Sequence, residues 1–411
     1  MRFEDYSFAP VIKKNLALAG FTRPTDIQYK TIPPVLKGED VLAIAQTGTG
    51  KTAAFVIPIL ELLISERNPE PGIRCLVMEP TRELALQITG VFNSLGKGSK
   101  IKTLCVHGGV EQDPQIDRLE KGIDILVATP GRMFDLVSQG HIVIDNVRIL
   151  VLDEADHMLD LGFVKDIRQL VKMLPKNRQT LFFSATIDAG IKKLAYSMVT
   201  DAIRIQISPK DPVARNVDHS VAFIGMDDKR FFLERLIVEH PESRIIVFVR
   251  TKVRAERVSL ALERASVTSL TMHGDKEQKE RISSLNQFRE GTVKVLIATD
   301  VSARGIDIDE VEYVVNYDLP EQPENYVHRV GRTGRGKRRG VAISFCSPEE
   351  KTLLEAIQEY TGNDINVLEI TKSDYSTTID FATDTKPDWR ALVVQAELDE
   401  EKYGKKKKKK K

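Results

Sequence analysis

The chain has 411 residues, of which 42% are apolar, and this suits two or three globular domains with sizeable cores. It contains no run of 18 apolar residues and no signal-peptide pattern, which excludes a membrane-spanning helix and predicts a cytoplasmic protein. Its three cysteines lack C-x-x-C spacing, so neither a disulfide framework nor a zinc site is expected. The net charge is +1, but seven of the 60 Lys and Arg form the run Lys405–Lys411. The rest of the chain is acidic, so overall charge does not indicate a nucleic-acid-binding protein.

Short apolar runs alternate with helical stretches from Val41 to about Ile207, and the same alternation restarts at about Ile245. This pattern predicts two α/β domains, each built on a parallel β-sheet. Pro58 falls inside the helix expected from Ala53 to Ile64, so we expect that helix to kink or to end early. The expected strands span residues 41–44, 74–78, 103–106, 123–128, 149–152, 180–184, 245–249, 267–272, 293–298, 313–317 and 340–345.

Two prolines among polar residues, Pro209 and Pro212, predict a linker between the domains. The predicted boundaries are an N-terminal domain at 1–207, the linker at 208–218, a C-terminal domain at 219–370 and a tail at 371–411. The tail begins rich in Ser, Thr and Asp and ends in polylysine, which predicts that it is largely disordered. The polylysine either adds non-specific attraction for RNA or only improves solubility, and both readings stay open.

The stretch Ala45–Thr52, AQTGTGKT, lies between an apolar strand and a helical segment. A glycine loop in this position cradles nucleotide phosphates with its backbone N–H groups, and the helix N-terminus adds partial positive charge. Lys51 is placed to reach the outer phosphates, and the Thr52 hydroxyl to ligate Mg²⁺. Ala45 replaces the first glycine of the general pattern, a form that resembles helicases more than small GTPases. The alternative is an ordinary glycine turn before a lysine.

Three acidic residues, Asp153, Glu154 and Asp156, directly follow the apolar run 149–152. A carboxylate at the carboxyl end of a buried strand, beside a phosphate loop, is where a Mg²⁺ ligand belongs. We therefore predict that Asp153 holds the metal and that Glu154 orients and deprotonates the attacking water.

With both sites in place, the chain resembles the DEAD-box ATP-dependent RNA helicases over roughly residues 3–369. The motifs that carry the resemblance are GFTRPTDIQ at 20–28, PTRELA at 80–85, TPGR at 129–132, DEAD at 153–156, SAT at 184–186, Gln278 with Arg281, ATDVSARGID at 298–307 and HRVGRTGR at 328–335. The sequence HMLDLGF at 157–163 favours the bacterial RhlE-type branch. The resemblance implies two tandem RecA-like domains, RNA-dependent ATP hydrolysis, and ATP and Mg²⁺ as cofactors.

The resemblance also implies an ATP site shared by the two domains. Gln28 can donate to and accept from the adenine edge, and Phe21 offers a face on which the base can stack. We therefore expect ATP to be preferred over GTP. Arg332 and Arg335 would act on the γ-phosphate from the second domain as arginine fingers. The residues expected to bind the nucleotide are Phe21, Arg23, Gln28, Gln46, Thr47, Gly48, Thr49, Gly50, Lys51, Thr52, Gly305 and Asp307, and the catalytic set is Lys51, Asp153, Glu154, Arg332 and Arg335.

RNA contacts are expected mostly on the sugar-phosphate backbone, where they position a strand without reading its sequence. The candidates are Thr81, Arg82, Gly109, Thr129, Arg132, Arg250, Gly274, Arg281 and Thr299. Each of these arginines can equally be a structural ion-pair residue.

Five residues are expected to couple the ATP side to the RNA side. Ser184 and Thr186 carry short hydroxyls that can hydrogen-bond Asp156. His328 and Arg329 are expected to brace the interface between the closed domains.

These assignments predict a monomeric clamp in which ATP and RNA each favour domain closure and closure separates a few base pairs. A DNA-directed superfamily 2 helicase is one alternative. Another is an ATP-gated RNA clamp or scaffold that remodels ribonucleoproteins with little unwinding, and the motifs do not separate it from a helicase. Proteins of ribosome assembly or RNA decay are the partner classes that stay open.

Overall fold

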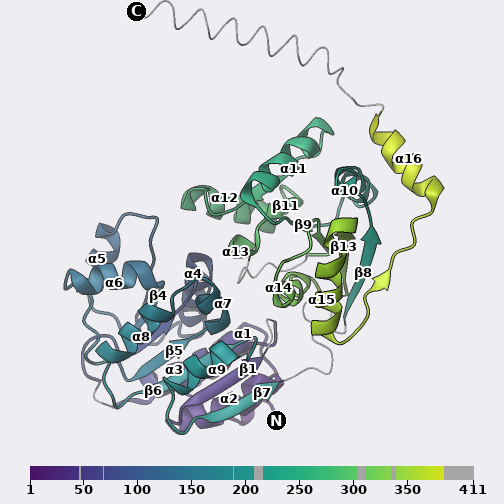
Figure 1. Ribbon diagram of the computed structural model, residues 1–411. Coiled ribbons are helices and arrows are strands. Elements are labelled where there is room, and N and C mark those ends of the chain that lie inside the picture. Colours follow the sequence, from purple (N-terminus) through teal and green to yellow (C-terminus); the bar gives the residue numbers. More distant parts are fainter. Residues whose placement is uncertain are drawn as a thin grey trace, which may run out of the picture.

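The computed structural model describes residues 1–45, 48–67, 69–187, 189–207, 216–303, 311–334 and 339–383. These residues form two α/β domains, each built on a seven-stranded parallel sheet. In Figure 1 the N-terminal domain is coloured purple to teal, and the C-terminal domain, green to yellow, lies above it. In the described part of the chain no helix is long and apolar enough to cross a membrane.

The sheet of the first domain has the strand order β3-β4-β2-β5-β6-β1-β7. Its strands are β1 (Val41–Ala45), β2 (Cys75–Met78), β3 (Thr103–Val106), β4 (Ile125–Ala128), β5 (Ile149–Leu152), β6 (Gln179–Ser184) and β7 (Ile203–Ile207). Its helices are α1 (Pro10–Leu18), α2 (Asp26–Leu36), α3 (Lys51–Ser65), α4 (Arg82–Leu95), α5 (Asp113–Glu120), α6 (Pro130–Ser138), α7 (Ala155–Asp160), α8 (Val164–Met173) and α9 (Ala189–Tyr196).

Helices cover both faces of this sheet, which is why its central strands are apolar throughout. Val77 of β2 and Val151 of β5 pack into one core cluster with residues of α3 and α4. Met78 and Leu152, the next residue of each strand, pack into the second cluster with residues of α6 to α9. This alternation fixes the face toward which the residues just beyond each strand point.

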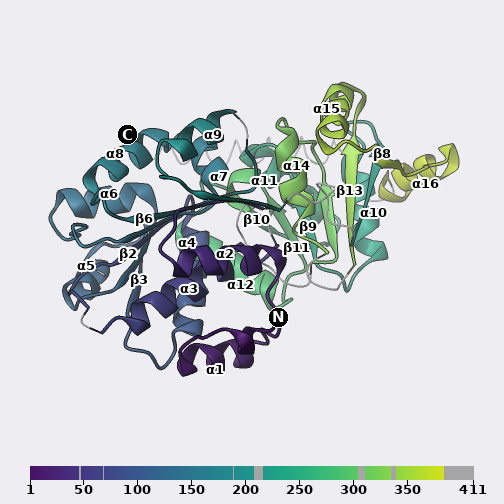
Figure 2. The same cartoon turned by 90° about the horizontal axis from the view of Figure 1, so that it is seen from below.

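The second domain repeats the plan with the strand order β10-β11-β9-β12-β13-β8-β14. Its strands are β8 (Val217–Phe223), β9 (Ile245–Phe248), β10 (Leu270–Met272), β11 (Val295–Ala298), β12 (Tyr313–Asn316), β13 (Gly340–Cys346) and β14 (Asn366–Val367). Its helices are α10 (Lys229–Glu239), α11 (Lys252–Arg264), α12 (Gln278–Arg289), α13 (Asp300–Ala303), α14 (Pro323–Val330), α15 (Lys351–Thr361) and α16 (Lys372–Thr383). Figure 2 shows both sheets from below, with helices on either side of each.

Every strand expected from an apolar run is present, with ends that differ by up to three residues. The strands β7, β8 and β14 were not expected. β8 begins at Val217, so the predicted linker is too long by two residues. Residues 208–215 lie outside the described part of the chain.

Two helices differ from what the sequence predicts. The helix α3 does not end at Pro58, as one of the two expected outcomes required, but continues to Ser65 with most of its residues buried. The predicted disordered tail begins with an ordered helix, α16. The Thr371 hydroxyl accepts a hydrogen bond from the Asp374 N–H (3.1 Å), and Tyr375 donates to Asp228 of the second domain (2.7 Å). Residues 384–411, with Trp389 and the polylysine run, lie outside the described residues.

Candidate nucleotide and RNA site

The loop between β1 and α3 has the backbone that a phosphate cradle needs. Gly48 and Gly50 adopt positive φ values of 78° and 92°, which residues with a side chain rarely take. A Cβ added to Gly50 would lie 2.5 Å from the Gln28 side-chain nitrogen, so only glycine fits there. Lys51 begins α3 and is buried. Gln46 and Thr47 lie outside the described residues.

Gln28 is tied to this loop by its own amide. Its Nε2 donates to the Gly50 carbonyl (3.1 Å), and its Oε1 accepts from the Thr25 N–H (2.9 Å) at the start of α2. An amide has a second N–H and a second lone pair, so both remain for a base. Nearby, Phe21 is half-buried and packs edge-on against Phe3, with ring centroids 5.9 Å apart. Gln28 thus has a structural role in this loop, and its amide retains capacity for a ligand.

The acidic turn after β5 lies on the same carboxyl edge of the sheet. Asp153 and Glu154 are buried, and the Glu154 N–H donates to Asp153 Oδ1 (2.9 Å). Glu154 adopts a left-handed conformation with φ of 46°. Burial raises the pKa of Asp153 to about 6, although the positive charge of Lys51 opposes the shift.

Glu154 has the opposite shift. Burial alone would raise its pKa, but the His157 ring, 3.8 Å from Glu154 Oε2, and the charge of Lys51 hold the pKa of Glu154 below its usual value. His328 of the second domain also lowers the pKa of Glu154, so it lies near this carboxylate. A carboxylate kept ionised in a buried site can accept a hydrogen bond from water and so orient it, while the lowered pKa makes it a weaker base.

Sequence reasoning missed a fourth acidic residue at this edge, Glu79. It follows β2 and is completely buried, and neither of its carboxylate oxygens has a hydrogen-bond partner among the residues that the structure describes. Burial and the charges of Asp153 and Glu154 raise the pKa of Glu79 well above the usual value. The signal was in the sequence, because Glu79 follows an apolar strand just as Asp153 does.

Lys51 Nζ, also at this edge, has no hydrogen-bond partner among the described residues, and Glu154 Oε2 has only the His157 ring at 3.8 Å. Buried charges normally pair or bind a ligand, so these atoms fit a bound anion and cation better than an apolar interior. Carboxylate and hydroxyl oxygens are the donors that Mg²⁺ prefers. Thr52 and Asp153 therefore fit the metal expected from the sequence.

The coupling motif is in contact with the acidic turn through Thr186. Asp156 Oδ2 accepts hydrogen bonds from the N–H groups of Ala185 (3.1 Å) and Thr186 (3.2 Å) and from the Thr186 hydroxyl (3.4 Å). The expected bond from Ser184 is not formed, because β6 buries the Ser184 hydroxyl, which has no partner.

Arg82 and Arg281, two of the candidate RNA residues, contact residues of the other domain. Gln278, at the start of α12, accepts from Arg82 Nη1 (3.2 Å) and donates to Glu83 Oε1 (3.2 Å) at the start of α4. Arg281 pairs with the same Glu83 oxygen (3.0 Å). The Arg82 guanidinium passes over Gly109, where an added Cβ would lie 1.9 Å from Nη1. Glu83 was not singled out from the sequence, since its partners come from the other domain.

The remaining RNA candidates lie just beyond strand ends. Thr129 follows β4, Gly274 follows β10, and Thr299 follows β11. Thr81 caps α4 by accepting from the Leu84 N–H (3.4 Å), and Arg132 donates to the Val110 carbonyl (2.8 Å). The carboxyl edge of each sheet therefore carries these groups, as ligand sites of parallel sheets do.

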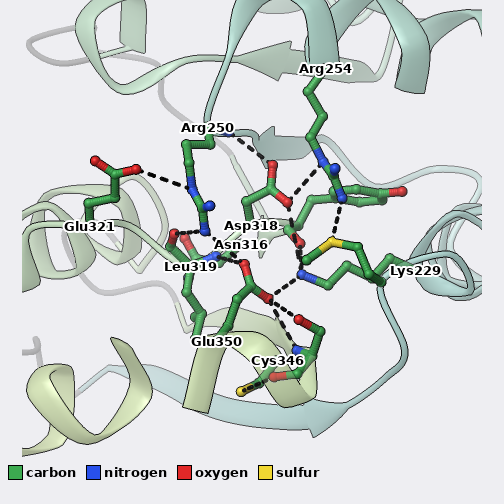
Figure 3. Close-up of polar contacts among 12 residues, drawn as sticks. Lys229, Arg250, Arg254, Asn316, Asp318, Leu319, Glu321, Cys346 and Glu350 are labelled. Carbon is green, nitrogen blue, oxygen red and sulfur yellow. Dashed lines mark hydrogen bonds and ion pairs between the residues drawn. The ribbon is translucent and has the colours of Figure 1, made fainter. Parts of the chain in front are cut away.

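Arg250 is held by an internal network of the second domain (Figure 3). Glu350 Oε1 accepts from its guanidinium (3.1 Å), and the other oxygen of Glu350 pairs with the buried Lys229 (2.5 Å). Asp318 accepts from the Arg250 N–H (3.0 Å). The Arg250 side chain is still 36% exposed, so it is both ion-paired and open to a ligand.

Arg329, expected to brace the domain interface, is hydrogen-bonded inside the second domain. It is 1% exposed, and its hydrogen bonds run to Asp300 (2.5 and 2.7 Å) and to the Asp318 carbonyl (2.6 Å), all within the second domain. It fixes α14 against the strand ends. Arg332 lies just after α14, not on it, and its Nε donates to the His328 carbonyl (3.0 Å). Gly305, Asp307 and Arg335 lie outside the described residues.

Comparison with known proteins agrees with this geometry. Residues 25–194 match the model of the DEAD/DEAH box helicase family, and residues 228–337 match that of the helicase conserved C-terminal domain. The chain is 41% identical to the DEAD-box ATP-dependent RNA helicase CshA of Bacillus subtilis, covering 87% of this chain and 72% of CshA. It is 42% identical to the ATP-dependent RNA helicase RhlB of Haemophilus influenzae, covering 89% of each.

Among solved structures, S. cerevisiae Dbp5 bound to RNA and ADP BeF3 matches with a TM-score of 0.81 and 33% identity, over 93% of this chain and 99% of that one. The L327V variant of Dbp5 bound to Nup159, Gle1, IP6 and ADP matches with a TM-score of only 0.62 at 32% identity, over 92% and 99%. Of these two structures, the RNA-bound one is therefore the better overall match.

Proposed function

The chain belongs to the DEAD-box ATP-dependent RNA helicases, and from this premise we propose which of its residues carry out the reaction. As a member of the family it is an RNA-dependent ATPase and RNA helicase with two RecA-like domains. The proposal concerns the roles of individual side chains, the metal and the way in which closure acts on RNA.

In the first domain, the loop at 48–50 and Lys51 bind the phosphates, while Gln28, Phe21 and Arg23 bind the base. Thr52 and Asp153 hold Mg²⁺, which neutralises phosphate charge when bound. Glu154 orients the attacking water and accepts its proton. Lys51 and Glu154 are both buried, and Lys51 Nζ has no hydrogen-bond partner among the described residues, which supports these roles.

In the second domain, Arg332 stabilises the charge that develops on the γ-phosphate, together with Arg335. Its hydrogen bond to the carbonyl of His328, a residue that helps to lower the pKa of Glu154, supports this role. Gly305 and Asp307 are assigned to the nucleotide only from the sequence motif.

The observation that carries the proposal is the join between α12 and α4. Gln278 and Arg281 of one domain contact Glu83 of the other, and Arg82 lies in the same cluster. A strand bound by Arg82 and Arg281 together would contact both domains at once. RNA would then favour the closed pair of domains, and so would a nucleotide bound between Lys51 and Arg332.

Closure would hold one RNA strand in a conformation that is incompatible with a regular duplex, so a few base pairs separate locally. Loss of the γ-phosphate would open the clamp. The decisive experiment is strand displacement on a short RNA duplex, with ATP and then with a non-hydrolysable analogue. Displacement with both nucleotides supports closure as the unwinding step, with hydrolysis needed only for release. Tight RNA binding without displacement would favour the ATP-gated clamp instead.

Several finer assignments stay predictions. The RhlE-type branch rests on HMLDLGF at 157–163, and the relatives named above are CshA and RhlB. Equal stimulation of ATP hydrolysis by DNA and RNA would revive the DNA-directed alternative. The cytoplasmic location, the monomeric state, and partners from ribosome assembly or RNA decay are each open to a separate test.

A further inference from the structure

Glu79 lies beside Asp153 at the carboxyl edge of the first sheet. The ladder continues one residue past each strand, because the Glu79 N–H donates to the Ala128 carbonyl (2.9 Å) and the Asp153 N–H donates to the Met78 carbonyl (3.3 Å). Glu79 and Asp153 are thus neighbours on adjacent parallel strands, whose backbones lie about 4.8 Å apart.

Both side chains point to the same face. Val77 and Val151, two residues earlier, pack in the cluster formed with α3. Since side chains alternate along a strand, Glu79 and Asp153 turn toward that face as well. Lys51 begins α3, and its charge acts on both carboxyl groups. Glu79 therefore lies on the side of the sheet where the nucleotide is proposed to bind.

Nothing in the described fold explains this carboxyl group as a packing element. It is completely buried, and neither oxygen accepts a hydrogen bond. A buried acceptor without a donor destabilises the folded state, and like charges add repulsion. A divalent cation with its hydration shell supplies both the donors and the opposite charge, and Mg²⁺ typically keeps several waters when a protein binds it.

We propose that Glu79 is a further acidic residue of the metal–nucleotide site, an outer-sphere ligand that contacts Mg²⁺ through its hydration shell. The inference rests on the proposed function, because it takes Thr52 and Asp153 as the residues that hold the ion. It adds a third strand end, that of β2, to the site formed after β1 and β5. Its consequence is that Glu79 strengthens the binding of Mg²⁺ and nucleotide to each other.

The test is a fluorescence titration of the full chain with N-methylanthraniloyl-ADP, in excess MgCl₂ and again in EDTA. The dissociation constant in EDTA divided by that in MgCl₂ measures the coupling between metal and nucleotide. Glu79→Gln keeps the shape of the side chain and removes its charge. We expect it to lower the ratio about fivefold or more, within the usual range of coupling between sites, and to leave the EDTA value near that of the wild type.

Two controls bracket the result. Asp153→Asn should make the two dissociation constants equal. Asp124→Asn should leave their ratio unchanged, because Asp124 pairs with Arg74 at the opposite end of the strands. If Glu79→Gln does not fold, Glu79→Ala is read in the same way. A shift in the unfolding midpoint with an unchanged ratio would mean that Glu79 is only structural, and would overturn the inference while leaving the proposed function intact. Wild type that binds no nucleotide would overturn both.

Discussion

Gln278 accepts a hydrogen bond from Arg82 and donates one to Glu83, so a single side chain of the second domain bridges two neighbouring residues of the first. Gln278 is only 4% exposed, which means that the domains desolvate it between them. An amide is suited to this position, because it can donate to a carboxylate and accept from a guanidinium at the same time.

Loss of this bridge should weaken the coupling between RNA and ATP. Gln278→Ala removes the α12 partner of Arg82 and leaves Glu83 with Arg281 alone, and we expect stimulation of ATP hydrolysis by RNA to fall about fivefold to tenfold. Asn286→Ala, an exposed change in the same helix, is the matched control. The measurement is the ATPase rate as a function of RNA concentration. Unchanged stimulation in the Gln278 variant would show that the bridge has no part in coupling.

Arg332 is expected to act on turnover and not on binding. Arg332→Ala should keep nucleotide affinity near that of the wild type and lower the rate of hydrolysis about 10³-fold, the lower end of arginine-finger effects. Single-turnover kinetics with equilibrium binding of ADP separates the two quantities. Weakened binding with a normal rate per bound ATP would contradict the assignment.

Gln28 contacts Gly50 as well as being placed for the base, so its loss should have two effects. Wild type should hydrolyse ATP in preference to GTP. Gln28→Ala should remove the preference and also raise the KM for both nucleotides, because the phosphate loop loses its 3.1 Å contact. Tyr29→Ala, an exposed neighbour, is the control. Equal use of GTP by the wild type would defeat the base-reading role.

Thr186 and Ser184 should differ in their importance for coupling. The Thr186 hydroxyl donates a hydrogen bond to Asp156, whereas the buried Ser184 hydroxyl has no hydrogen-bond partner in the described structure. Thr186→Ala should therefore reduce strand displacement more than ATP hydrolysis, and Ser184→Ala should reduce it less. Both activities are measured on the same RNA duplex. An equal or larger effect of Ser184→Ala would show that the coupling contact forms only when the ligands are bound.

The helix α16 should be an integral part of the second domain. Tyr375→Phe removes hydrogen bonds to Asp228 and Gly225 and is expected to destabilise this domain by about 1 kcal/mol. Ser373→Ala changes an exposed residue of the same helix and should be neutral. Urea denaturation of the two variants checks this. Identical midpoints would mean that α16 contributes nothing to stability.

Most strands of the two sheets were predictable, because strands that are buried on both faces consist of unbroken apolar runs. The runs ending at Leu152 and Met78 show this directly, and the acidic residues beyond them point to the site edge. The edge strands were harder. Only Ile205 of β7 is buried, and β14 has only two residues, so neither forms a long apolar run.

What depends on contacts distant in the sequence was not predictable. α16 is polar and weakly periodic, and it is ordered by Tyr375 meeting Asp228, 147 residues away. The partnership of Gln278 with Glu83 depends on how two domains face each other, which no local pattern encodes. Glu79 is different, because its position directly after the apolar strand β2 can be read from the sequence. The resemblance to the helicase family, however, assigns acidic roles only to residues 153–156.

The position of α16 has a practical consequence. It packs on the side of α10 that faces away from the first domain, as both views show (Figures 1 and 2). A dye attached at the exposed Ser373 would move with the second domain and would not contact the proposed ligand-binding surfaces. Paired with a second dye on α5, it would report the opening and shutting of single molecules in real time.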